Sequence, residues 1–249
     1  MPTFRLLAGP PASAALWTEV LRRLRSLGHE AHAIELLEDA QPSATVESLA
    51  QGLLDRGRVG PGEVLVAHGL AVPVARVVAA RCALGGLVLS NGPLHGLDPI
   101  SRALQRLPGP TLRMLMRPMF SQPILASSLG LRRTVINPYV MDRDTVVMLT
   151  TPWAGSAAGR RAAAALLADL PGAAPGEPLG GARTLLLWGD EDPLYPPLVA
   201  DRLAATQARV ERQTIPGGDH FHPLERPWAF ADLLHASWPV ERPAERATG

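Results

Sequence analysis

The chain has 249 residues, of which 47% are hydrophobic, so it is long enough to bury the core of one full α/β domain. Its formal net charge is +1, its basic residues are all arginines and no basic run stands out, which excludes the charge pattern typical of nucleic-acid binding. The single cysteine, Cys82, excludes an internal disulfide, and no signal-peptide features or bilayer-length apolar run stand out, so we expect a cytoplasmic protein with no membrane partner.

Short apolar runs alternate with helical patterns along most of the chain. The first run, 3–8, enters a loop at Gly9, and apolar residues then recur at helical spacing over 14–27, with Gly28 placed to end the helix. The further predicted strands cover 31–36, 63–67, 87–90, 183–188 and 210–215, and the further predicted helices cover 44–56, 72–82, 197–207 and 224–238. This alternation predicts an α/β fold with a mostly parallel sheet of about six strands and helices on both faces.

The segment 98–175 breaks the alternation. It contains no convincing strand and is rich in Leu, Met, Pro and Arg. We interpret it as an inserted helical lid, which leaves 1–97 and 176–249 as the core domain. A lid inserted after the fourth strand would lie above the carboxyl ends of the strands, where open α/β sheets bind ligands. Its methionines either line an adaptable apolar pocket or pack the lid on the core; the second role is the commoner one. The methionines are Met114, Met116, Met119, Met141 and Met148.

Three parts of the chain resemble the α/β-hydrolase superfamily, in the branch of esterases and lyase-like enzymes with a helical cap. The first is A-G-P-P-A-S-A-A-L-W at 8–17, which follows the first central strand. The second is A-H-G-L-A at 67–71, which is similar to the G-x-S-x-G turn that carries the nucleophile. The third is a pair of turns, L-L-W-G-D-E-D-P-L-Y-P at 186–196 and I-P-G-G-D-H-F-H-P-L-E-R-P at 215–227. The resemblance implies an α/β-hydrolase fold over essentially the whole chain.

The resemblance also implies roles for residues. In the family a serine attacks a carbonyl group, a histidine takes its proton, and an acid orients the histidine. By position the histidine is His220 and the acid is Asp192, while Gly69 stands where the serine is expected. Glycine adopts the strained conformation of such a turn at little cost. The sequence therefore predicts a turn that is kept without its nucleophile.

The oxyanion site is predicted to be altered as well. The family uses two backbone N–H groups, one after the turn residue and one in the first loop. Leu70 supplies the first, but the residue after Gly9 is Pro10, and proline has no N–H. Loss of one such donor typically costs on the order of 3 kcal/mol of transition-state stabilisation.

Other candidate residues lie at the ligand end of the predicted sheet or in the lid. Asn91 and His95 follow the fourth strand, where they either orient a substrate or belong to a turn. Tyr139 and Trp153 are candidates for substrate contact because lids cover sites. His222 either supports the site residues or faces solvent, and we expect it to face solvent. The spacing of the histidines favours no metal site, and the chain calls for no cofactor.

Two functions remain open from the sequence. The first is an enzyme without a covalent intermediate, in which His220 and Asp192 transfer protons on a small apolar molecule bearing a carbonyl or hydroxyl group. Cyclisation, elimination, carbon–carbon cleavage and isomerisation fit this chemistry, for instance in secondary metabolism, as does hydrolysis by an activated water. The alternative is a non-catalytic ligand-binding or partner protein on the same scaffold. A homodimer is compatible with either.

Overall fold

The predicted α/β architecture is confirmed. The structure is a computed structural model that describes residues 2–38, 41–94, 108–128, 130–170, 179 and 181–240. All six predicted strands form one parallel sheet in the order β2-β1-β3-β4-β5-β6. They are β1 (Phe4–Ala8), β2 (Ala31–Glu35), β3 (Val64–His68), β4 (Gly86–Ser90), β5 (Thr184–Gly189) and β6 (Val210–Ile215).

Burial along the strands follows their place in the sheet. Every residue of β3, β4 and β5 is buried, as expected for central strands covered on both faces. The edge strands β2 and β6 are only partly buried, and β6 carries Glu211 and Arg212. The register aligns Ala8 of β1, His68 of β3 and Ser90 of β4 in one row. The turns that leave these three strands therefore begin side by side at one edge of the sheet.

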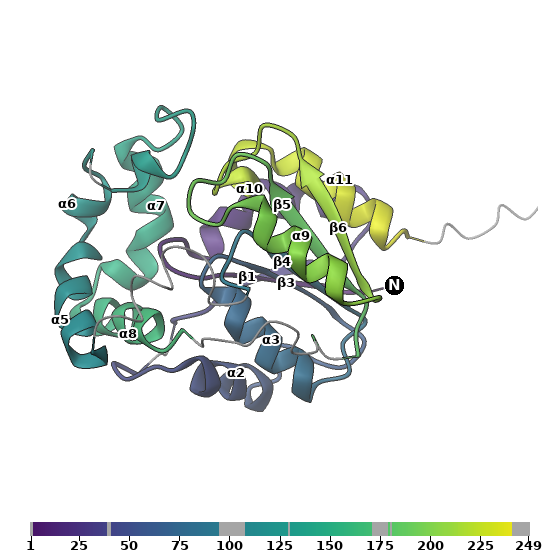
Figure 1. The fold of residues 1–249 in the computed structure, drawn as a ribbon, viewed down its shortest axis with the longest axis horizontal. Coiled ribbons are helices and arrows are strands. Elements are labelled where there is room, and N and C mark those ends of the chain that lie inside the picture. The colour runs from purple at the N-terminus through teal and green to yellow at the C-terminus, as the bar shows by residue number, and fades with distance from the viewer. Residues whose placement is uncertain are drawn as a thin grey trace, which may run out of the picture.

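Helices cover both faces of the sheet (Figure 1). Helices α1 and α11 pack together on one face, while α2 and α3 pack together on the other, and α9 lies against β5 and β6. The side chain of Thr45 caps α2 by accepting a hydrogen bond from the N–H of Ser48, and Gly28 follows α1 with a φ of +89°. These helices, with the short ones that precede α1 and α11, are η1 (Ala14–Trp17), α1 (Thr18–Ser26), α2 (Val46–Asp55), α3 (Ala71–Arg81), α9 (Pro197–Thr206), α10 (His222–Glu225) and α11 (Pro227–Ser237).

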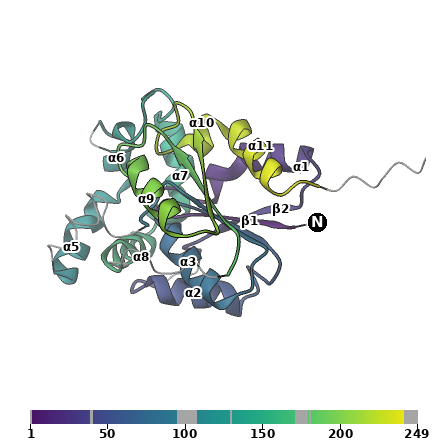
Figure 2. The ribbon, with the colours of Figure 1, turned by 45° about the vertical axis from the view of Figure 1, so that its right-hand side comes forward.

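The described part of the lid is mostly helical. It lies beyond the carboxyl ends of the strands, on the side opposite the N-terminus (Figures 1 and 2). Helix α8 packs against both α5 and α7, and the described residues of the lid contain no strand. The two expected lid boundaries, near 98 and 175, lie outside the described residues, as does His95. The elements are α5 (Gly109–Met119), α6 (Gln122–Leu125), η2 (Leu131–Arg133), α7 (Arg143–Ala154) and α8 (Ala157–Ala168).

The methionines of the lid do not build an inner pocket. Met141 is buried and Met116 is partly buried against the core, but Met114, Met119 and Met148 are exposed. Buried apolar side chains of the lid join the hydrophobic core, and polar contacts add to this junction. The indole N–H of Trp153 donates to the carbonyl of Ala12 at 3.1 Å. None of the helices described here has the length and apolar character needed to cross a membrane.

Candidate active site

The turn from β3 into α3 is tight and has a glycine at its apex. Gly69 has a φ of +60°, a conformation that residues with a side chain rarely adopt. Its N–H donates to the carbonyl of Ser90 at 3.2 Å, and its own carbonyl accepts from Val72 at 3.0 Å. A Cβ atom placed on Gly69 would lie 3.8 Å from the carbonyl oxygen of Gly9 and 4.0 Å from Nε2 of His220. The apex therefore has room for a small side chain, and that room faces the histidine.

The first loop, residues 9–13, packs directly against this turn. The N–H of Gly9 donates to the carbonyl of His68 at 3.1 Å, and a Cβ atom on Gly9 would lie only 2.3 Å from the backbone nitrogen of Ala71. A glycine is therefore required for this close approach. Pro10 follows at once and is buried. The loop thus lies where the oxyanion site was expected, but its next residue supplies no N–H.

The predicted acid and histidine come together at the carboxyl ends of β5 and β6. Nδ1 of His220 lies 3.0 Å from Oδ2 of Asp192, and both side chains are almost fully buried. The other carboxylate oxygen, Oδ1, accepts from the N–H groups of Leu194 at 2.7 Å and Tyr195 at 3.1 Å. Because an ionised carboxylate only accepts hydrogen bonds, Nδ1 of His220 is the donor to Asp192, and in the neutral imidazole the lone pair is then on Nε2. Nε2 is also the nitrogen that faces Gly69.

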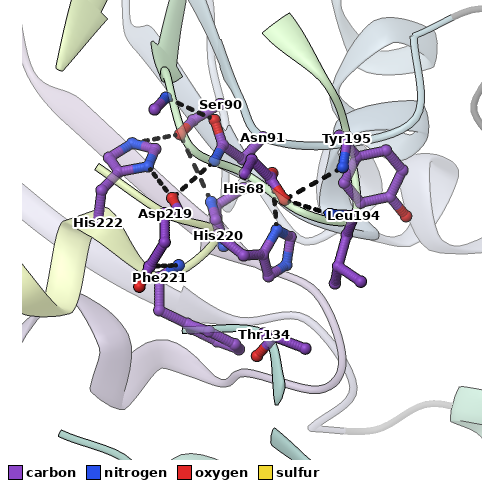
Figure 3. Close-up of polar contacts among 12 residues, drawn as sticks. His68, Ser90, Asn91, Thr134, Leu194, Tyr195, Asp219, His220, Phe221 and His222 are labelled. Atoms are coloured by element: carbon purple, nitrogen blue, oxygen red, sulfur yellow. Dashed lines mark hydrogen bonds and ion pairs between the residues drawn. The ribbon is translucent and has the colours of Figure 1, made fainter. Parts of the chain in front are cut away.

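The expectation that His222 faces solvent is wrong. Its side chain is fully buried, with Nδ1 donating to the carbonyl of Asp219 at 3.0 Å and Nε2 lying 3.0 Å from Oγ of Ser90. The hydroxyl of Ser90 therefore donates to His222, and its oxygen is 3.4 Å from Nδ1 of His68. Figure 3 shows this chain of side chains beside His220. Sequence reasoning missed the chain because its members come from β3, β4 and α10.

Burial keeps two of these histidines neutral. It lowers the pKa of His222 to about 4, although the hydrogen bond to Asp219 opposes the shift. It also lowers the pKa of His68 well below the usual value, helped by the nearby His220 and His222. The rings of His68 and His220 are 4.9 Å apart, centroid to centroid. Of these three histidines, His220 is the one whose ring nitrogen lies within hydrogen-bond distance of a carboxylate, that of Asp192.

Asn91 joins the two turns that carry the pair. Its amide nitrogen donates to the carbonyl of Asp219 at 2.9 Å, and its amide oxygen accepts from the N–H of Gly189 at 3.0 Å. Asn91 is fully buried and has a φ of +37°. Both polar groups of the amide are therefore used to hold main chain on either side of the site, at the peptide before His220 and at the end of β5.

The carboxylate of Asp219 links the histidine turn to the lid. Its Oδ1 accepts from the N–H of Phe221 at 2.8 Å, and its Oδ2 accepts from the N–H of Ile136 at 2.7 Å. Burial and the neighbouring Asp219 raise the pKa of Glu225 to about 8. The motif G-G-D-H contains Asp219, but the sequence provides no sign that this side chain would reach a residue 83 positions away.

The two candidate residues of the lid lie in different surroundings. Trp153 is buried at the junction with the first loop, where its ring also meets Phe120 edge-on at 5.4 Å. Tyr139 is 83% exposed. The structure therefore brings Trp153, but not Tyr139, into the region beside the first loop. Within the described part of the chain, no three His, Cys, Asp or Glu side chains are grouped so that they could hold a metal ion.

The parallel sheet, the tight turn after β3 and the buried aspartate–histidine pair at its carboxyl edge define the α/β-hydrolase class of protein. A sequence profile of the Alpha/beta hydrolase family matches residues 6–233, and the chain belongs to that family. Among curated protein sequences, none matches the chain.

Solved structures share this fold at low sequence identity. A thermophilic esterase from Thermogutta terrifontis is 21% identical, with a TM-score of 0.68 over 95% of this chain and 89% of that one. The Cif epoxide hydrolase from Acinetobacter nosocomialis is 15% identical, with a TM-score of 0.74 over 95% of this chain and 82% of that one. An α/β-hydrolase-fold protein from Burkholderia ambifaria is 19% identical, with a TM-score of 0.66 over 94% and 89% of the two chains.

Proposed function

We propose that the protein is an enzyme that uses His220 and Asp192 to transfer protons on a small apolar molecule beneath the lid, without a covalent intermediate at residue 69. One observation carries the proposal. Nε2 of His220 faces the apex of the turn, where Gly69 has no side chain to occupy the space. With a serine at position 69, the hydroxyl group would fill this space. With glycine, a substrate or a water can enter it and come within reach of Nε2 of His220.

The proposed step is a proton transfer. Nε2 of His220 takes a proton from a carbon or hydroxyl group of the substrate, and the resulting imidazolium is stabilised by Asp192 at 3.0 Å. The proton returns to the product in a later step, so the protein is unchanged. Cyclisation, elimination, carbon–carbon cleavage and isomerisation all follow this scheme.

Hydrolysis by an activated water is the second candidate. The esterase and the epoxide hydrolase that share this fold are hydrolases by name, which favours attack by water on an ester or epoxide. His220 would then take its proton from the water. The space beside Gly69, which faces Nε2 of His220, supports this candidate equally.

To test the proposal, a compound that binds the protein must first be found. Apolar ketones, esters, epoxides and alcohols are screened for an increase in melting temperature, and each compound that binds is incubated with the protein and followed by mass spectrometry. General acid–base catalysis typically contributes about 10²–10⁴-fold, so His220→Ala is expected to lose roughly that much turnover, and Asp192→Asn a comparable amount. His32→Ala is the matched control, because His32 is exposed and pairs only with Glu30 among the described residues. If the wild-type protein returns every bound compound unchanged, the protein is a binding protein and the proposal fails.

A serine restored at the apex gives a separate test. The position of Cβ in Gly69→Ser would bring the hydroxyl within reach of His220, since the gap from Cβ to Nε2 is 4.0 Å. We expect little hydrolysis of nitrophenyl esters, because Pro10 leaves one oxyanion donor absent. Strong esterase activity would show that only the hydroxyl is lacking, and would overturn the argument from Pro10.

A further inference from the structure

The lid carries an apolar surface that the site does not use. In the part of the chain that the structure describes, most exposed large apolar side chains lie in the lid, and three of them, Met114, Leu115 and Met119, lie on α5. Met114 is 68% exposed. Both views place α5 at the outer edge of the lid, away from the sheet (Figures 1 and 2). The surface therefore faces outward and not toward His220.

Helix geometry sorts the residues of α5 into faces. The helix packs against α8, and the partly buried Met116 marks its inner side. At about 100° per residue, Met114 then points outward, Leu115 and Met119 lie on one flank, and Arg113 and Arg117 lie on the other. An outward apolar sector with arginines along one flank is a pattern seen in helices that lie in the plane of a membrane surface.

The charges of the chain are unevenly distributed along its sequence. The stretch from Pro99 to Met141 contains six arginines and no aspartate or glutamate. Since the whole chain carries only +1, taking away these six charges leaves −5 on the rest. The positive charge of the protein is therefore concentrated in the lid segment that contains α5.

The arginines around α5 border two surface hollows. One, of about 540 Å³, is lined by Arg117, Ser121, Gln122 and Arg160, among others. The second, of about 300 Å³, is lined by Arg113, Arg117 and Arg161 together with Met114. No acidic residue is among the described residues that line either hollow, and within the described ranges none of the four guanidinium groups forms an ion pair. Arginine binds phosphate through paired N–H groups, so these hollows suit lipid headgroups.

We infer that this face of the lid, formed by α5 with Arg160 and Arg161, docks on an anionic lipid bilayer. Met114, Leu115 and Met119 enter the apolar boundary of the bilayer, while the arginines contact the phosphates of the headgroups. Docking of this kind needs no spanning helix, and it replaces the expectation of no membrane partner. It does not depend on the chemistry proposed for His220, because none of these side chains belongs to the acid–histidine pair.

The experiment is sedimentation of the full chain with lipid vesicles. Vesicles of phosphatidylcholine containing about one-third phosphatidylglycerol are compared with vesicles of pure phosphatidylcholine, at low and at raised ionic strength. We expect binding to the anionic vesicles that weakens as salt is added. From the usual contribution of one arginine at an anionic surface, the double variant Arg113→Gln, Arg117→Gln should bind about 30-fold more weakly. Met114→Ser should bind about tenfold more weakly, because a methionine no longer leaves water.

Matched controls separate this surface from overall charge. The variant Arg22→Gln, Arg202→Gln removes the same charge from exposed residues outside the lid, and Leu198→Ser removes an exposed apolar side chain from α9; both should bind like the wild type. The melting temperature of each variant is measured first, and little change is expected at these exposed sites. The inference is overturned if the wild type does not prefer anionic vesicles, or if the control charges matter as much as those of α5. It is also overturned if the wild type is a dimer in solution that binds no vesicles and Met114→Ser makes it monomeric.

Discussion

Replacement of Asn91 by alanine tests whether this side chain holds the two turns of the site. The change removes two buried hydrogen bonds, to the carbonyl of Asp219 and from the N–H of Gly189. The carbonyl of Asp219 keeps its bond from His222, but the N–H of Gly189 is left buried without that acceptor. A buried polar group without a partner costs about 1–3 kcal/mol, and the second lost bond adds about 1 kcal/mol. The φ of +37° adds about 1 kcal/mol more for alanine.

The expected loss in the free energy of unfolding is therefore about 3–5 kcal/mol, measured by urea denaturation with the midpoint and the slope fitted separately. Asn91→Gly removes the same hydrogen bonds but adopts a positive φ without strain, so it should be no less stable than Asn91→Ala. Asn137→Ala is the matched control, because Asn137 is exposed in the lid. If Asn91→Ala loses less than about 1 kcal/mol, or no more than Asn137→Ala, the two hydrogen bonds of the Asn91 amide do not hold the turns of the site.

Two further predictions concern the turn and the buried histidine. Gly69→Ala should fold with a loss of about 1–2 kcal/mol, because its Cβ meets only ordinary contacts and the cost is the positive φ. Turnover should fall, since the methyl group takes the space that faces His220; unchanged turnover would contradict the proposed role of that space. His222 has a folded pKa of about 4, below its ordinary value of 6.5, so the unfolded chain binds the proton first. The contribution of this pKa difference to the free energy of unfolding is fully present above pH 6.5. As the pH falls to 4, up to about 3 kcal/mol of that stability is lost. Denaturation curves at several pH values should therefore show a flatter pH dependence for His222→Phe, whereas parallel dependences would refute the assignment. The raised pKa of Glu225 acts in the opposite direction, but it is common to both proteins and cancels in the difference.

The buried histidines have a consequence for the chemistry. Because His68 and His222 stay neutral, they add no positive charge beside His220, and the carboxylate of Asp192 is the charge that acts on it most directly. Their hydrogen bonds instead hold Ser90 and Asp219, which lie next to the turns of the site. The site thus consists of one histidine beside a carboxylate and several polar residues that hold the surrounding main chain in place.

Local patterns in the sequence were enough to predict much of this protein. The alternation of strand and helix patterns predicted all six strands, and it is clearest at β3, β4 and β5, since a strand buried on both faces must be apolar along its length. The pair Asp192 and His220 was predicted from the resemblance of the turns at 186–196 and 215–227 to the α/β-hydrolase superfamily, and the parallel strands β5 and β6 bring these two turns to the same edge of the sheet. The glycine at position 69 was predicted to occupy a strained turn, and its φ of +60° agrees.

Other properties were decided only by the tertiary structure. His222 is buried because Ser90, 132 residues earlier in the chain, lies where the imidazole needs a partner. Asn91 holds both turns because β4 lies next to β5 in the sheet, which brings the end of β5 at Gly189 and the turn after β6 at Asp219 within reach of its amide. The exposed methionines of α5 could be assigned to the outside only when α8 was seen to cover the opposite side. A helix has a full circle of faces, and its neighbours determine which one is buried.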